Sequence, residues 1–576
     1  MRNPLIVAAL LAAGIVSVAP ALAQKEYELQ PDSFVRPGVA QGKVEHFVLK
    51  GSKVFPGTER DVWYYVPAGH DLAKPLALMV FQDGGGYADR NGGFRVPAVF
   101  DNLIAQGAMP ATLGIMVNPG VVPATDGKTQ LPRYNRSVEY DGFDGKYAAF
   151  LIQEVIPEVL RRSGARITND PANRAISGAS SGGIAAFTAA WHRPDYFGKV
   201  LGFISSFTDL RGGHGYPTLI RKTERKPLRI FLQEGVNDQD IYSGSWPIGN
   251  EDVVAALRFA GYDLRYVTGP GGHDGRQGTA VLPEALRWLW RPGGLETSGT
   301  RQPIASVVLR DNEGWRAVDG AGGVDALATL ADGTLVVAGS GEVRTLGGAA
   351  MATGLGRISA VAAGPAGTVY AALPDRKQVV RLAPGPLTVV ARGIKVSSIA
   401  VRHTGTLFLL EEGTGRIHWV GPNGKRTVAA TGLPGAPGIT LVPDQGLLLV
   451  APDPAHGKYG QSLRIAADES LVDAQHYHDV AAPYGEPGTA AAGLAVDANG
   501  WLYVASAIGI QMLDQAGRVN GIVLSPGPGR PGPIAFAGGE RNLLYAVVDG
   551  GLHVRRTKVR GVTTAEGPTK PPPPRL

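Results

Sequence analysis

The residues with the clearest capacity for chemistry are a serine, an aspartate and a histidine in the first half of the chain. Residues 178–182 read Gly-Ala-Ser-Ser-Gly, so Ser180 is the centre of a G-x-S-x-G pattern. A strand-compatible segment, residues 173–177, precedes it, and residues 184–191 favour a helix. A strand–turn–helix of this kind exposes a serine hydroxyl at the end of a sheet. Because the chain holds 80 glycines, the pattern alone is weak and needs partners.

A serine hydroxyl attacks a carbonyl when a base, usually histidine, takes its proton and a carboxylate orients that base. Asp238 follows a predicted strand at residues 228–233, and His273 follows another at residues 264–268. The order serine, acid, histidine on loops after successive strands is one that parallel sheets use for acyl transfer. We therefore predict Ser180 as the nucleophile, His273 as the base and Asp238 as the orienting acid.

The acid and the base each have competitors nearby. Asp240 is an alternative to Asp238, whereas Glu234 lies nearer the strand end, where a structural role suits it better. His192 follows the helix after the serine, so packing or surface exposure is expected for it.

The transition state of acyl transfer also needs two backbone N–H groups to hold its oxyanion. The predicted strand at residues 76–81 runs into a glycine-rich loop, whose Gly84 and Gly85 let the backbone approach a substrate carbonyl. Ser181, directly after the nucleophile, is the expected second source of an N–H group.

Three further side chains are candidates for substrate binding. His214 lies in a glycine-flanked segment that is able to line the site. Tyr242 and Trp246 follow the acid and have the ring surface to stack on a sugar or an aromatic acyl group, with core packing as an equal alternative for each.

The elements that must position these residues alternate between strands and helices. The apolar patterns predict strands at residues 61–67, 76–81, 112–117, 200–205, 228–233 and 264–268, and helices at residues 147–163, 252–260 and 282–289. This alternation favours a mostly parallel sheet with helices on both faces. We predict an α/β-hydrolase domain over residues 51–292, after an N-terminal leader at residues 24–50.

The second half of the chain has a different pattern. After a Gly- and Pro-containing linker at residues 293–303, a glycine turn followed by a β-rich run recurs six times, with turns at residues 332–333, 366–367, 404–405, 445–446, 499–500 and 541–542. Such spacing is typical of one four-stranded blade per repeat. We predict an all-β six-bladed propeller at residues 304–560, with an irregular array of sandwiches as the alternative. The Pro-rich tail, residues 561–576, is expected to be disordered.

The ends and the composition restrict the class of protein. Arg2, an apolar run and Ala-Leu-Ala at residues 21–23 indicate a signal peptide at residues 1–23, and hence a periplasmic or secreted protein with no membrane span after cleavage. The net charge of +6 is spread along the chain, so nucleic-acid binding is not indicated. Without cysteine, disulfides and thiolate chemistry are excluded.

Residues 50–292 resemble the enterochelin-esterase and feruloyl-esterase-like branch of the α/β-hydrolases. The resemblance is carried by residues 81–85 (Phe-Gln-Asp-Gly-Gly), 136–140, 147–157, 177–183, 235–238 and 271–274. It implies a serine carboxylesterase that needs no cofactor and acts on a small-molecule or polysaccharide-linked ester, including siderophore lactones and feruloyl or acetyl esters. An inactive hydrolase fold with a binding or scaffolding role is an alternative. The sequence says nothing about protein partners.

The repeats resemble the gluconolactonase and regucalcin-like six-bladed propellers, most clearly at residues 492–504. That family holds a divalent metal through Glu, Asn and Asp side chains. The corresponding positions here are near Asp325, at residues 436–438 (Ala-Pro-Gly) and at residues 492–493 (Ala-Gly), so two of three ligands are lost. We predict no metal site and a non-catalytic propeller, with a metal-dependent sugar lactonase as the alternative. A His-Tyr-His-Asp run at residues 476–479 is expected to be polar surface.

Overall fold

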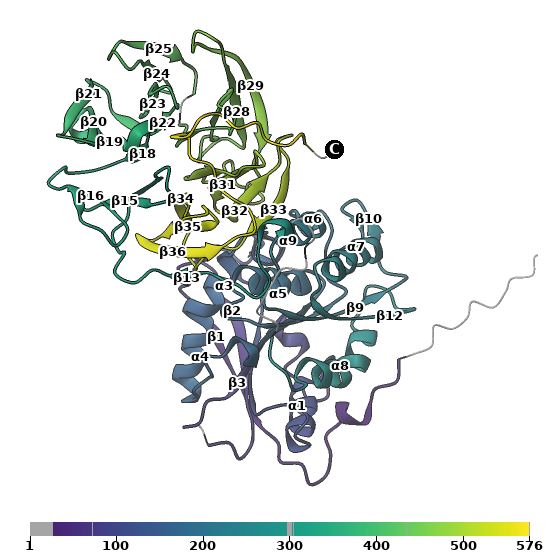
Figure 1. The fold of residues 1–576 in the computed structure, drawn as a ribbon. Helices are drawn as coiled ribbons and strands as arrows, with labels where there is room; N and C mark the ends of the chain where they lie inside the picture. Colours follow the sequence, from purple (N-terminus) through teal and green to yellow (C-terminus); the bar gives the residue numbers. More distant parts are fainter. Residues whose placement is uncertain (1–26, 72, 296–301, 303–304, 434, 575–576) are drawn as a thin grey trace, which may run out of the picture.

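The chain forms a sheet flanked by helices, joined to a ring of small sheets (Figure 1). The computed structural model describes residues 27–71, 73–295, 302, 305–433 and 435–574. The predicted signal peptide lies outside the described residues, as does most of the predicted linker. The predicted fold class, an α/β-hydrolase followed by a six-bladed propeller, is confirmed.

The first half is built on one eight-stranded sheet in the order β1-β2-β4-β3-β7-β8-β9-β12. The strands are β1 Lys43–Leu49, β2 Arg60–Val66, β3 Ala77–Gln82, β4 Thr112–Val117, β7 Arg174–Ala179, β8 Lys199–Phe203, β9 Arg229–Gly235 and β12 Asp263–Gly269. From β4 to β12 all neighbours are parallel, whereas β1 and β2 pair antiparallel at one edge. The leader therefore contributes the edge strand β1, which the sequence patterns did not predict.

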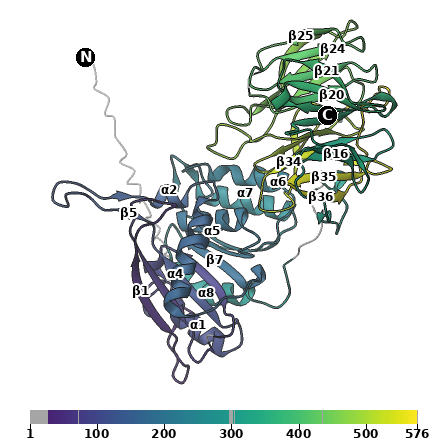
Figure 2. The same ribbon diagram turned by 90° about the vertical axis from the view of Figure 1, so that its left-hand side faces the viewer.

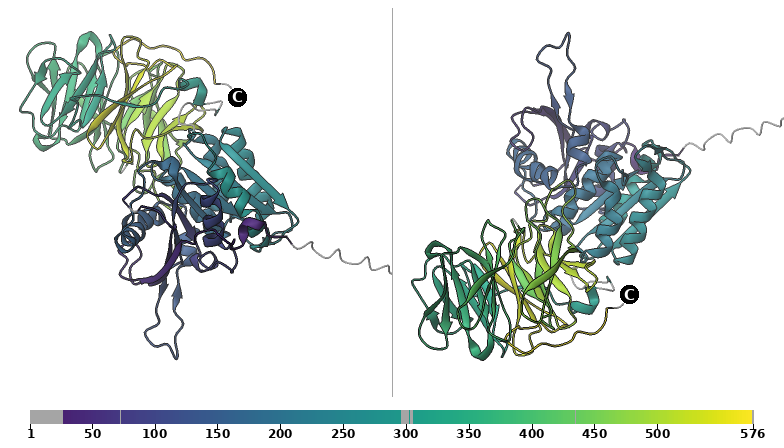
Figure 3. Two further views of the ribbon diagram at one scale, coloured as in Figure 1. Left: turned by 90° about the horizontal axis from the view of Figure 1, so that it is seen from below. Right: turned by 90° about the horizontal axis from the view of Figure 1, so that it is seen from above.

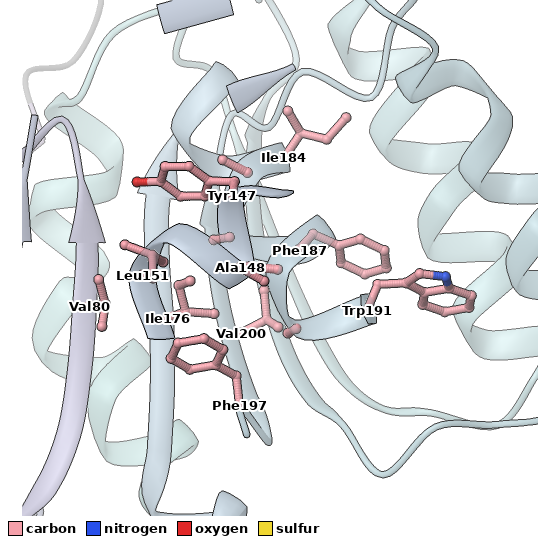
Figure 4. Packing of buried hydrophobic residues seen from close by; sticks show 14 of the residues in the cluster. Val80, Tyr147, Ala148, Leu151, Ile176, Ile184, Phe187, Trp191, Phe197 and Val200 are labelled. Carbon is pink, nitrogen blue, oxygen red and sulfur yellow. The ribbon is translucent and has the colours of Figure 1, made fainter. Parts of the chain in front are cut away.

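Helices cover both faces of this sheet. They are α1 Val96–Ala105, α2 Arg136–Tyr140, α3 Lys146–Phe150, α4 Ile156–Ser163, α5 Ser181–His192, α6 Tyr216–Lys222, α7 Trp246–Phe259 and α8 Arg276–Leu289, with a π-helical turn, Leu151–Val155, between α3 and α4. The fully buried strand β3 directs Val80 into the core beneath α3 and α5, where Phe187 and Trp191 pack (Figure 4). Its neighbours Met79 and Phe81 point to the opposite core, formed with α1 and α8. Continuous apolar strands such as β3 are typical of sheets buried on two sides.

Two short β-hairpins lie in the connections that follow β4 and β9. β5 Val121–Val122 pairs with β6 Arg133–Tyr134, and β10 Asp240–Ile241 pairs with β11 Gly244–Ser245. The loop between β5 and β6 projects from the domain as a long arm (Figures 2 and 3). Among the described residues, no helix is long and apolar enough to cross a membrane.

The second half contains six four-stranded sheets arranged in a ring (Figure 1). Five blades are β14–β17 (Ala326–Thr329, Leu335–Gly339, Glu342–Thr345, Ala350–Ala352), β18–β21 (Ala360–Ala363, Val369–Leu373, Gln378–Ala383, Thr388–Arg392), β22–β25 (Val396–Val401, Leu407–Glu411, Ile417–Val420, Arg426–Ala430), β26–β29 (Ile439–Leu441, Leu447–Val450, Tyr459–Ile465, Leu471–Asp479) and β30–β33 (Leu494–Val496, Leu502–Ser506, Gly509–Leu513, Val519–Val523). The sixth combines β34 Pro531–Ala537, β35 Leu543–Val548 and β36 Gly551–Arg556 with β13 Arg316–Ala317 from the other end of the domain. A short helix, α9 Ala305–Val308, leads into β13. Each predicted glycine turn joins the first two strands of a blade.

The C-terminal segment lies against the propeller, which differs from the disorder expected of it. Thr563 Oγ1 donates to the carbonyl of Thr329, and Glu566 forms a bidentate pair with Arg541 at 2.8 and 2.9 Å. Val562, Thr563 and Thr564 help to line the central channel. The segment therefore covers one end of that channel, an arrangement that its Pro-rich composition does not reveal.

Candidate active site

Ser180 occupies a sharp turn between β7 and α5. Its φ of 58° and ψ of −125° lie in a region that side-chain-bearing residues rarely adopt, at an energetic cost of about 1–3 kcal/mol. The turn is possible because Gly178 and Gly182 touch: a Cβ added to Gly178 would lie 2.3 Å from the carbonyl oxygen of Gly182. The Ser180 N–H donates to the carbonyl of Phe203 at 2.9 Å, which fixes the turn over β8. The serine is partly exposed at the sheet end.

Asp238 and His273 reach the serine from the loops after β9 and β12. Ser180 Oγ lies 2.8 Å from His273 Nε2, and Asp238 Oδ1 lies 2.6 Å from His273 Nδ1. The structure thus brings the three predicted residues into one hydrogen-bonded series. The alternative acid, Asp240, is exposed in β10 and has no hydrogen bond to the imidazole.

Asp238 shares its environment with a second buried carboxyl, Glu234. Glu234 Oε2 and Asp238 Oδ2 are both buried, and with both groups ionised neither would have a hydrogen-bond partner among the described residues. Burial raises the pKa of Glu234, and Asp238 raises it further, to about 10, which favours the protonated form of Glu234 near neutral pH. Burial alone would raise the pKa of Asp238 too, but hydrogen bonds from His273, Glu234 and the Gln239 N–H hold it below its usual value.

The loop after β3 lies beside the start of α5. Asp83 has a left-handed backbone with φ 59°, and its carboxylate accepts two hydrogen bonds from Arg136 at 2.8 and 2.9 Å. Gly84 is pressed against the backbone of β4, where a Cβ would lie 2.4 Å from the Met116 carbonyl carbon. The close approach of this loop to the start of α5 depends on Gly182, where a Cβ would lie 3.0 Å from Asp83 Oδ2.

The three predicted oxyanion donors differ in their present partners. The Gly85 N–H donates to Asn118 Oδ1 at 3.0 Å, so this group is already engaged. The N–H groups of Gly84 and Ser181 have no such partner within the described chain. Gly84 and Ser181 are therefore the better candidates.

The three predicted substrate residues have different surroundings. Tyr242 is 92% exposed on the β10–β11 hairpin, and His214 lies in an open segment with Nδ1 3.1 Å from Asp209. Trp246 is only 2% exposed, and its ring meets the His273 imidazole edge-to-face at 5.4 Å between centroids. Trp246 is therefore a core residue, as the alternative interpretation of the sequence had it. It packs against His273 and offers no free face for stacking.

Of two further neighbours of the series, the sequence reasoning missed Ser206 and considered Glu234 only as a structural residue. Ser206 Oγ lies 3.4 Å from Ser180 Oγ, on the segment after β8. Glu234 was assigned a structural role, yet it shares the pocket of Asp238. A carboxylate four residues before the predicted acid was a visible signal for Glu234, whereas nothing in the pattern singled out Ser206.

The propeller channel holds a volume of about 270 Å³. Its lining includes Asp325, several serines and threonines, and backbone at Pro437 and Gly493. Among the described residues there is no group of three or more His, Asp or Glu side chains that would hold a metal ion. Hard cations need several oxygen ligands, so this donor set does not fit the metal of the propeller family.

Comparison with known proteins finds a family model that matches part of the first half of the chain. Residues 52–253 match the family model "Putative esterase". The iron(III) enterobactin esterase of Dickeya dadantii (strain 3937) is 27% identical over 249 residues, which cover 40% of this chain and 52% of that protein. The chain thus spans about half the length of this curated relative.

Two solved structures each resemble part of the chain. The enterobactin esterase from Shigella flexneri covers 43% of this chain and 60% of its own, at 21% identity and a TM-score of 0.35. A gluconolactonase from Xanthomonas campestris covers 44% of this chain and 92% of its own, at 18% identity and a TM-score of 0.38. Because both TM-scores are low, neither similarity supports a function for this chain. The match to the family model "Putative esterase" is confined to residues 52–253.

Proposed function

We propose that the protein is a serine carboxylic-ester hydrolase whose reaction takes place at Ser180, His273 and Asp238. The observation that carries this proposal is the hydrogen-bonded series itself, with 2.8 Å from Ser180 Oγ to His273 Nε2 and 2.6 Å from His273 Nδ1 to Asp238. The family match of residues 52–253 supports the same class of reaction. The active domain is proposed to span residues 51–292.

In the first half of the reaction, Ser180 Oγ attacks the ester carbonyl carbon while its proton passes to His273 Nε2. Asp238 accepts a hydrogen bond from the Nδ1–H of His273, which keeps Nε2 free of a proton in the resting state and stabilises the imidazolium once it forms. The bond from the carbonyl carbon to the alcohol oxygen then breaks, and His273 returns the proton to the departing alcohol. The acyl group remains on Ser180.

Water completes the cycle. It attacks the acyl carbon and gives its proton to His273, after which Ser180 recovers that proton and the acid product leaves. In both steps negative charge develops on the carbonyl oxygen. The N–H groups of Gly84 and Ser181 are proposed to hold this charge, each worth about 10²–10³-fold in kcat in sites of this type. The paired Asp83 and Arg136 keep the Gly84 loop in place.

The proposed substrates are esters of carbohydrates, phenolic acids or siderophore-type compounds. The relative from Dickeya is an iron(III) enterobactin esterase, which supports esters of this kind. The N-terminal segment, residues 1–23, is proposed to direct export to the periplasm or beyond, and N-terminal sequencing of the mature protein tests this. The propeller is proposed to be non-catalytic, because two expected metal ligands are replaced at residues 436–438 and 492–493.

Hydrolysis of p-nitrophenyl acetate by the Ser180→Ala variant tests the proposal. The account predicts a fall in kcat of about 10⁴-fold or more, since removing the nucleophile of such a series disables the whole unit. Ser163→Ala, at the end of α4, is a matched control that should hydrolyse the ester at the wild-type rate. Full activity in Ser180→Ala would show that the reaction takes place elsewhere.

A further inference from the structure

The propeller is fixed to the hydrolase domain by a buried contact. Glu224, just after α6, pairs with Arg555 of β36 through two hydrogen bonds of 2.8 and 2.9 Å, and the Arg555 side chain is only 2% exposed. The Glu224 N–H also donates to the carbonyl of Ile522 in β33 at 2.9 Å, and Leu524 N–H donates to Glu224 Oε2. Figure 1 shows α6 beside β33 at this junction. A buried, bidentate pair joined to backbone hydrogen bonds fixes the orientation of the two domains.

The propeller also contacts the hydrolase domain at a second place. Tyr484, in the connection between β29 and β30, lies so close to Gly212 that a Cβ there would be 2.4 Å from the tyrosine ring. Its ring centroid is 5.7 Å from that of Phe143 and 6.2 Å from that of His214, and its hydroxyl lies 3.5 Å from Asp209 Oδ1. Even so, Tyr484 is 46% exposed, so part of its ring is free.

The segment that Tyr484 touches also packs against residues that neighbour the proposed nucleophile. Gly213, next to Gly212, is packed against the carbonyls of Ser206 and Thr208, where a Cβ would lie 2.8 and 2.9 Å from their oxygens. Ser206 in turn places its Oγ 3.4 Å from Ser180 Oγ. Tyr484 is therefore connected to Ser180 through the contacts of residues 212–213 and Ser206.

We propose that Tyr484 of the propeller, together with His214 and Asp209 of the hydrolase domain, forms an outer subsite that binds a hydroxylated aromatic ring of the ester substrate, remote from the ester bond. This inference rests on the proposed function of Ser180. The side chains of His214 and Asp209 are 53% and 54% exposed and Tyr484 is 46% exposed, so part of an aromatic ring, an imidazole and a carboxylate lie together at the surface. Asp209 Oδ1 already accepts from the Gly212 N–H at 3.2 Å, which leaves its Oδ2 for a ligand. A tyrosine face attracts a second ring, and a carboxylate accepts a hydrogen bond from a phenol.

The subsite explains why the propeller is held rigidly against this end of the sheet. A flexibly tethered domain would not keep Tyr484 at one distance from Ser180, whereas the Glu224–Arg555 pair does so. The alternative is that Tyr484 only closes the domain interface. In that case its removal would affect stability, and all esters equally, without any preference for a ring.

Two esters that differ only in a terminal ring separate these possibilities: ethyl hexanoate and ethyl 6-(4-hydroxyphenyl)hexanoate. The wild-type protein should prefer the ring-bearing ester. Tyr484→Leu keeps an apolar contact with Gly212 but removes the ring, and should raise KM for the ring-bearing ester about 3–10-fold, the size of one aromatic contact. It should leave ethyl hexanoate unchanged. Tyr484→Phe should retain most of the preference.

The control is Tyr477→Leu, which removes a tyrosine that is 37% exposed and whose hydroxyl donates to Gln515 inside the propeller. It should leave both esters unchanged. No preference for the ring in the wild-type protein, or equal effects of Tyr484→Leu on the two esters, would overturn the subsite. Failure of the proposed function has a different signature, because ethyl hexanoate would then not be hydrolysed, or would still be hydrolysed by Ser180→Ala.

Discussion

Glu234 and Asp238 place buried carboxyl oxygens beside each other next to His273, and burial together with Asp238 raises the pKa of Glu234. A protonated Glu234 would supply a donor for Asp238 Oδ2, which otherwise has no partner among the described residues, and would leave Asp238 Oδ1 for the imidazole. Tyr266 also faces Glu234, and its phenol stays neutral because burial and the nearby carboxyl raise its pKa. We therefore expect a protonated Glu234 to position Asp238.

Glu234→Gln should preserve activity near neutral pH, because the amide N–H₂ donates to Asp238 as the carboxyl does. At alkaline pH the wild-type protein should lose activity as Glu234 ionises beside Asp238, and the glutamine variant should not. Glu234→Ala leaves Asp238 Oδ2 buried without a donor, at a cost of about 1–3 kcal/mol, and should lower kcat about tenfold. The measurement is kcat/KM of a simple ester against pH. Identical alkaline profiles for the wild type and Glu234→Gln would contradict this role.

The same pair makes the free energy of unfolding depend on pH. The pKa of Glu234 is raised in the folded state, so its contribution to stability is complete below the unfolded pKa and is lost as pH rises toward the folded pKa. Glu234→Gln removes this pH-dependent loss of unfolding free energy, whose slope is at most about 1.4 kcal/mol per pH unit. Urea unfolding should show the variant gaining stability over the wild type between about pH 5 and pH 8. A constant difference across that range would count against a protonated Glu234.

Gly178→Ala should damage both the fold and the site, because the added methyl would lie 2.3 Å from the carbonyl oxygen of Gly182 and backbone must move. Overpacking of this kind costs about 1–3 kcal/mol. A displacement of Ser180 of about 1 Å is able to lower kcat about 10²-fold. Gly127→Ala, which meets nothing within 4 Å, is the control for both measurements. Wild-type thermal stability and kcat in Gly178→Ala would rule out the tight turn.

Arg555→Leu should loosen the propeller from the hydrolase domain. It leaves Glu224 buried without its cation, which costs about 3–5 kcal/mol for a buried pair. Arg464→Leu breaks the exposed pair with Asp473 and should cost less than about 1 kcal/mol. Thermal unfolding and limited proteolysis compare the two variants. Equal effects would mean that the interdomain pair does not hold the interface.

Local pattern was enough to predict the architecture and to select three residues that the structure brings together. Continuous apolar runs marked the central strands, and glycine turns marked the six blades, because each signal depends on near neighbours in sequence. Ser180, Asp238 and His273 were predictable because each follows a strand of a parallel sheet, so their loops meet at one edge.

What the sequence did not predict depends on contacts between distant segments. β1 pairs with β2 although its alternating residues are only weakly apolar, and residues 561–574 lie on the propeller through bonds to distant residues such as Thr329 and Arg541. Tyr484 lies in the second half of the chain, and only the docking of the domains brings it to Gly212. The buried state of Trp246 likewise follows from the packing around His273.

The most direct test of the central claim is to treat the protein with a fluorophosphonate and locate the adduct by mass spectrometry. The account predicts stoichiometric phosphonylation of Ser180 Oγ, loss of esterase activity in step with labelling, and no adduct in Ser180→Ala. An active protein that resists the reagent, or an inactivated one that carries its adduct at another residue, would contradict it.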